Sequence, residues 1–129
     1  MLIASTENYS IREDKEINRL YIVLRGFWLD PSKTPEYINH LAFAAERLKS
    51  PFTALVDVRE MRTPGHLVKE MHVEAQQVTI NAGLVKTAEV FPPGISKELE
   101  LEGYASVSNL SRRGFKSMEK AEEWLNQSP

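Results

Sequence analysis

Short apolar runs alternate with amphipathic helical stretches along this chain, and the alternation limits the fold more than any other feature of the sequence. The first two runs are separated by only four residues, which is typical of a β-hairpin. The third run is apolar at most positions, as in a strand buried on both faces. Five runs have the length and composition of β-strands, at residues 9–14, 19–26, 52–58, 84–91 and 112–117.

The stretches between these runs have the periodicity of helices. Thr34 and Pro35 are a favourable cap and first residue, and Pro51 ends the helix that they begin. The inward face of this first helix is predicted to consist of Tyr37, Leu41, Ala44 and Leu48. The second helix is predicted to use Leu67, Met71, Ala75 and Val78.

Two further helices complete the pattern. The second helix ends at Gly83, where a left-handed cap is expected. A weaker helix is predicted at 95–106, where Gly103 lowers the helical propensity. The last helix begins after Ser117, and its predicted inner face is Met118, Ala121, Trp124 and Leu125.

The resulting order of elements is β-β-α-β-α-β-α-β-α. It predicts an α/β fold with a single open mixed sheet of about five strands, crossover helices and an antiparallel hairpin at the start. The chain has 129 residues and neither a linker nor a low-complexity tract interrupts it, so we predict one domain over residues 1–129.

Composition excludes several classes of partner. The formal net charge is -2, with 16 Lys and Arg interspersed among 18 Asp and Glu, so no basic field is available for nucleic acid. Because cysteine is absent, there is no disulfide or reactive thiolate. The first ten residues are too polar for a signal segment and no apolar run is long enough to span a membrane, which predicts a soluble cytoplasmic protein.

The element order and three segments, "TALVDVREM", "KTAEVFPP" and "GFKSMEKAEEWL", resemble the STAS superfamily. The likeness is to its branch of small proteins similar to the sporulation anti-anti-sigma factor, and it covers roughly residues 8–127. The end of the chain matches that branch at Phe115, Ala121, Trp124 and Leu125. The resemblance implies a regulatory or binding fold without chemistry of its own.

Regulatory STAS proteins carry a phosphorylated serine at the start of the second helix, in an Asp-Ser-Ser-Gly type of motif. Counting from Asp57, that place is held here by Gly65 and His66, and neither can replace the serine. Thr63 is the nearby hydroxyl, and a phosphate on it would face the helix amides. A simpler interpretation is that Thr63 caps the helix and Pro64 is its first residue. Thr63 and His66 are the candidate regulatory residues.

A second hypothesis is a pocket beyond the carboxyl ends of the strands, where ligands collect in open α/β sheets. Some proteins of this fold are similar to lipid-transfer proteins that hold a hydrophobic guest between sheet and helices. The same aromatic residues also fit plain packing, with Phe27 and Phe91 in the core and Trp28 over the sheet edge. The candidate pocket residues are Phe27, Trp28, Met61, His66 and Phe91.

Enzyme chemistry finds little support in the sequence. His66 and Glu70 share a helix face but His72 points away, so we predict no metal site. Asp57 has the position of the phosphoryl-accepting aspartate of a receiver domain, but the chain lacks the acidic pair that such a domain places after its first strand. We predict that Asp57 bonds to a neighbouring loop. Phosphate-loop, dinucleotide and nucleophile-elbow motifs are absent, so neither enzymatic activity nor a cofactor is expected.

Taken together, these features favour a non-enzymatic, STAS-like regulatory or protein-interaction module of unknown pathway. The alternative is a carrier or sensor of a small apolar, lipid-like ligand bound at the carboxyl ends of the strands. The expected partner is another protein, and a homodimer stays open.

Overall fold

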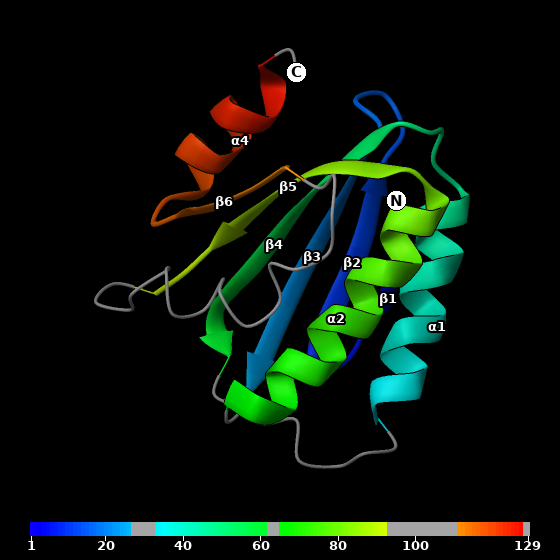
Figure 1. The fold of residues 1–129 in the computed structure, drawn as a ribbon, viewed down its shortest axis with the longest axis vertical. Coiled ribbons are helices and arrows are strands. Elements are labelled where there is room, and N and C mark those ends of the chain that lie inside the picture. Colours follow the sequence, from blue (N-terminus) through cyan, green and yellow to red (C-terminus); the bar gives the residue numbers. More distant parts are fainter. Residues whose placement is uncertain (27–32, 62–64, 93–110, 128–129) are drawn as a thin grey trace.

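The computed structural model describes residues 1–26, 33–61, 65–92 and 111–127, and for residues 33–34 and 65–72 it describes the backbone alone. These residues form one mixed β-sheet with helices on both faces (Figure 1). The elements in chain order are β1 (Leu2–Ser5), β2 (Tyr9–Asp14), β3 (Arg19–Gly26), α1 (Lys33–Glu46), β4 (Phe52–Met61), α2 (Gly65–Ala82), β5 (Leu84–Val90), β6 (Ser111–Phe115) and α4 (Met118–Asn126).

The predicted α/β class with one open mixed sheet is confirmed. The sheet has six strands rather than about five, because Leu2–Ser5 pairs antiparallel with β2. We predicted no strand at this position, where the apolar run is short. All five predicted strands are present. The helix predicted at 95–106 lies outside the described residues.

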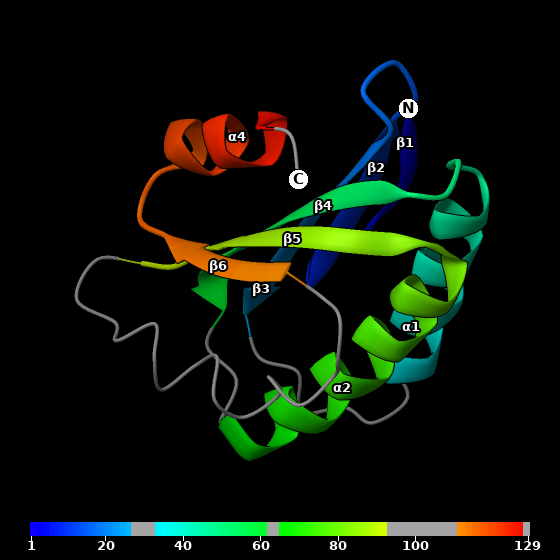
Figure 2. The same cartoon turned by 45° about the horizontal axis from the view of Figure 1, so that its top comes forward.

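The strands lie side by side in the order in which they occur in the chain. The strand β2 is antiparallel to both of its neighbours, β1 and β3, and β3, β4, β5 and β6 are parallel. Helices α1 and α2 follow β3 and β4 and cover one face, whereas α4 lies on the opposite face (Figure 2). The parallel connections therefore all advance across the sheet in one direction.

Each face of the sheet has its own apolar core. Under α1 and α2, the four inward residues predicted for the first helix are all buried, and they pack on β2, β3 and β4. Under α4, Ala121 and Leu125 pack on Leu55, Ala88 and Val90. The helical periodicity of the sequence thus orients both faces correctly.

Two of the predicted helix caps are confirmed. Gly83 has a φ of 121°, and a Cβ added there would lie 2.5 Å from the side chain of Ser50, so glycine is required. The hydroxyl of Ser117 accepts a hydrogen bond from the backbone N–H of Lys120 at 3.3 Å. The first helix begins at Lys33, one residue before the predicted cap Thr34.

Buried cations fasten α4 to the sheet. The guanidinium of Arg19 donates to Glu122 at 2.7 Å, to Asn126 at 3.0 Å and to Thr53 at 2.8 Å. The ammonium of Lys86 donates to the backbone oxygen of Trp124 at 2.5 Å, where it satisfies a carbonyl at the end of the helix. Polar contacts therefore hold α4 along with its small apolar core.

Candidate functional site

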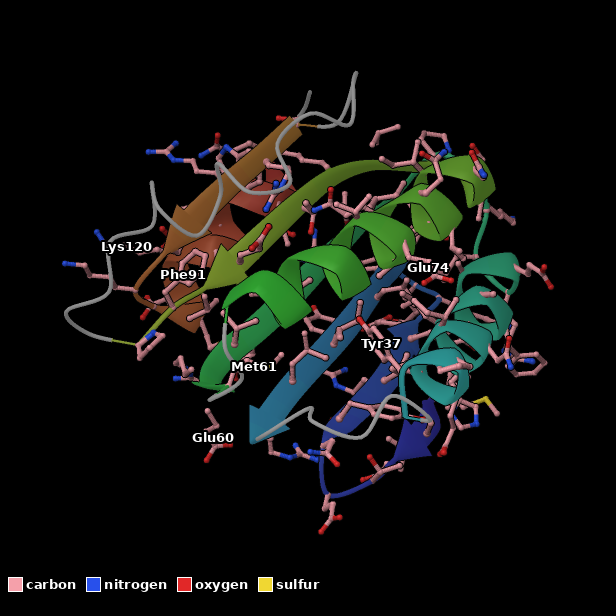
Figure 3. The ribbon with its side chains drawn as sticks, turned by 60° about the horizontal axis from the view of Figure 1, so that its bottom comes forward. Tyr37, Glu60, Met61, Glu74, Phe91 and Lys120 are labelled. Carbon is pink, nitrogen blue, oxygen red and sulfur yellow. The ribbon has the colours of Figure 1, made fainter. Side chains whose placement is uncertain are left out.

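Two of the five predicted pocket residues, Met61 and Phe91, lie at the ends of neighbouring strands β4 and β5 (Figure 3). Phe91 is buried in the core under α1 and α2, and its backbone N–H donates to the carbonyl of Phe115 at 2.9 Å. Met61 is partly buried and packs against the same core. Phe91 therefore has the packing role that the plainer interpretation predicts.

The remaining predicted residues are not brought into a described site. Phe27, Trp28 and Thr63 lie outside the described residues. His66 lies in the first turn of α2, where the backbone alone is described. The pocket and the regulatory threonine thus remain predictions.

The strand order bears on where a ligand crevice is expected. In open α/β sheets the crevice forms where the strand order reverses and neighbouring connections leave in opposite directions. Here β3 to β6 are in chain order, and no such reversal occurs among them. The general reason for placing a pocket at the carboxyl ends of these strands is therefore missing.

The structure instead places a polar cluster under α1, near the carboxyl end of β3. The hydroxyl of Tyr9 lies 2.6 Å from Nδ1 of His40 and donates to Glu36 at 3.3 Å. Burial raises the pKa of Tyr9 to about 12, and the charge and hydrogen bond of Glu36 act in the same direction. A phenol with so high a pKa is a poor general acid at neutral pH, so the cluster favours a structural role.

Ionisation of Tyr9 should make stability fall at alkaline pH. The pKa of Tyr9 in the folded state lies above the ordinary value of 10.0. The neutral phenol therefore adds to the free energy of unfolding in full below pH 10, and this contribution is lost as the pH rises through 12. The total loss of unfolding free energy is about 3 kcal/mol. Urea unfolding of wild type and Tyr9→Phe from pH 8 to 11.5 measures the difference in their free energies of unfolding, which should narrow above pH 10. A difference that stays constant with pH would contradict the raised pKa of Tyr9.

A buried ion pair joins the last two strands. Glu89 of β5 is 3% exposed and accepts a hydrogen bond from Nε of Arg112 on β6 at 3.0 Å. Burial raises the pKa of the neighbouring Tyr37, and the charges of Tyr9 and Glu89 raise it further. Sequence reasoning missed this pair. The sequence did hold one signal. Glu89 lies two residues after Thr87 in a run predicted to be buried, so its carboxylate is on a buried face of the strand and needs a partner there.

Asp57 is positioned differently from the prediction. It accepts hydrogen bonds from the backbone N–H of Arg59 at 3.0 Å and from the guanidinium of the same residue at 2.8 and 2.9 Å. Burial alone would raise the pKa of Asp57, but the hydrogen bonds from Arg59 outweigh burial and lower it. The predicted bond to a neighbouring loop is wrong, because the partner lies two residues along the same strand β4.

The two ends of the sheet differ in chemistry. The end strand β6 carries Arg112 and Arg113, and charged residues discourage pairing with another strand. The other end strand, β1, contains neither charge nor proline, and its protective features are its length of four residues and a register shift between Leu2 and Ala4. The edge of β1 therefore carries less charge against an additional strand than the edge of β6.

Exposed apolar side chains gather beside this edge. Met1 is 70% exposed, Leu2 is 60% exposed, and Phe43 on the adjacent helix α1 is 54% exposed. Arg47 links Met1 and Phe43: its guanidinium lies 5.7 Å from the ring of Phe43 and donates to the sulfur of Met1 at 3.2 Å. Its Nε also bonds Glu13 at 2.7 Å, which fixes its position. We call Met1, Leu2 and Phe43 the edge patch.

Two other kinds of feature are absent from the part of the chain that the structure describes. No group of three or more acidic, histidine or cysteine side chains is close enough there to hold a metal ion. Among the described helices, none combines the length and the apolar character needed to cross a lipid bilayer.

Comparison of the chain with models of known protein families gives no match, and comparison with curated proteins gives none either. The site is therefore interpreted from its own geometry.

Proposed function

We propose that the chain is a non-enzymatic, STAS-like protein-interaction module that binds its partner at the free edge of β1. The observation that carries the proposal is the edge patch beside a strand without charge or proline. A partner strand paired to β1 satisfies its outward backbone groups, and partner side chains cover Leu2 and Phe43. Both gains act together only if the partner binds as an extended segment.

The buried polar clusters of the sheet support a structural role better than a catalytic one. Three candidate acids and bases already have partners: Glu89 pairs with Arg112, and Tyr9 donates to Glu36. A cytoplasmic location and a regulatory role for Thr63 belong to this proposal on sequence grounds alone.

Two hollows among the described residues bear on carriage of a lipid-like guest. The space between the sheet and helices α1 and α2 is about 30 Å³. A benzene-sized site needs about 150 Å³, and lipid chains need more. A hollow of about 460 Å³ is large enough, but apart from Met1 its lining is charged: Arg12, Glu13, Asp14, Lys15, Glu16 and Arg47. Neither hollow combines the size and the apolar lining of a lipid site, which favours the interaction module over the carrier.

Two double variants of the full chain test the proposal. Leu2→Lys with Phe43→Ser changes the edge patch, and Ile17→Lys with Val85→Ser makes the same chemical changes at exposed apolar positions elsewhere. Tagged proteins are purified from the organism's own cells, co-purifying proteins are quantified by mass spectrometry, and the mass of each complex is measured by light scattering. We expect the edge variant to lose its partner about tenfold or more, and the control to keep it.

Either kind of partner is visible in this experiment. Loss of a second protein specifies a heterologous partner, and a halved particle mass specifies a second copy of this chain. Equal capture and equal mass for wild type and edge variant would contradict the proposed site.

A further inference from the structure

A small cavity lies between α2 and the sheet, independent of the edge patch. Its volume is about 30 Å³, and its walls come from α1, α2 and strands β3 to β5. Most of the wall is apolar, and the side chains in it that carry polar groups are Tyr37, Gln76, Thr79, Thr87 and Glu89. A cavity of this size has room for one or two water molecules.

One of these polar side chains has a buried atom without a hydrogen-bond partner among the described residues. Gln76 of α2 is 9% exposed, and its Oε1 atom has no partner there. Thr87 of β5 is 3% exposed and lines the same cavity. A buried amide left without a hydrogen bond costs about 1–3 kcal/mol, so folded proteins rarely leave one unmatched.

The other three polar residues are already engaged, and Tyr37 is among the residues with an interaction of their own. Thr79 donates to the backbone oxygen of Ala75 at 2.9 Å. Glu89 pairs with Arg112. The atom without a partner is therefore Oε1 of Gln76 on the helix wall, and the hydroxyl of Thr87 on the strand wall belongs to the same cavity.

We propose that this cavity is a binding site for a water molecule that bridges the Gln76 amide to the Thr87 hydroxyl. Water fits the volume, and it both donates and accepts. The amide of Gln76 offers a donor and an acceptor, and rotation about its last side-chain bond turns either one toward the cavity. The bridge joins α2 to the sheet where the facing residues Ala54 and Ala75 are too small to fill the gap.

Replacement of the two anchors by apolar residues of similar shape tests the site. Gln76→Met and Thr87→Val should each lower the folding equilibrium constant about fivefold, because the water loses an anchor. The double variant should lose less than the two single effects combined, since either change already releases the water. Thr87→Ser keeps the hydroxyl and should keep the coupling to Gln76. Gln77→Met, the same change on the exposed face of α2, should stay within about twofold of wild type.

Nuclear magnetic resonance gives a second readout that packing alone does not change. Wild type should show cross-peaks between water and the methyl group of Thr87, and the double variant should lack them. If the cavity were empty, Gln76→Met would replace an unbonded buried amide with apolar atoms, and the folding equilibrium constant would rise. A rise, or additive losses without water cross-peaks in wild type, would overturn the proposal.

Discussion

Replacing Arg112 with Met is expected to lower the free energy of unfolding by about 3–5 kcal/mol. Arg112 and Glu89 form an ion pair in which both side chains are almost fully buried, between β5 and β6. Removal of the guanidinium leaves the carboxylate in a medium of low polarity without its cation, and this uncompensated charge is the main cost. Urea unfolding at pH 7 measures the loss.

Two further variants separate the ion pair from packing. The double variant Glu89→Leu with Arg112→Met removes both charges and should regain most of the lost stability. Arg113→Met removes an exposed arginine from the same strand and should cost less than about 1 kcal/mol. A loss for Arg112→Met no larger than that for Arg113→Met would mean that the pair does not hold the strands together.

Replacing Arg19 with Met is expected to cost about 2–4 kcal/mol and to loosen α4. Its buried guanidinium makes charge-assisted hydrogen bonds to Glu122 and Asn126 of that helix and to Thr53 of β4. Because Glu122 is partly exposed, it regains water when the arginine is lost, which limits the cost. Urea unfolding gives the total, and amide hydrogen exchange shows where the protein opens.

The location of the change distinguishes a local from a general effect. Exchange should accelerate in α4 and not in α1, which packs on the other face of the sheet. Arg12→Met removes an exposed arginine that stacks on Tyr21 and should cost less than about 1 kcal/mol. Equal acceleration in α1 and α4 would show that Arg19 supports the whole fold rather than the docking of one helix.

The fold was largely predictable because its signals are local. Tyr37, Leu41, Ala44 and Leu48 recur with helical spacing, and all four are buried on one side of α1. Gly83 was identified because its position follows a helical pattern, and its positive φ bears this out. The strand β1 was missed because a run of three apolar residues is too short to distinguish a strand from an irregular N-terminal segment.

The chemistry of the site was harder to predict because it depends on contacts between distant residues. Glu89 and Arg112 are 23 positions apart, and nothing local in the sequence pairs one with the other. Phe91 was assigned both a pocket and a core role from its residue type, and burial favours the core. In the sequence, Gln76 resembles any polar residue of a helix. That its Oε1 atom has no partner depends on the strands that it faces, which the sequence of the helix does not reveal.

Site-specific photo-crosslinking in living cells tests the interaction at the β1 edge most directly. A photoreactive amino acid is placed at Leu2, or at Ile17 as an exposed apolar control away from the edge patch, and adducts are identified by mass spectrometry. The proposed function predicts one dominant protein adduct from Leu2 and none of that mass from Ile17. The same adduct from both positions, or none from Leu2 while the protein remains folded, would contradict it.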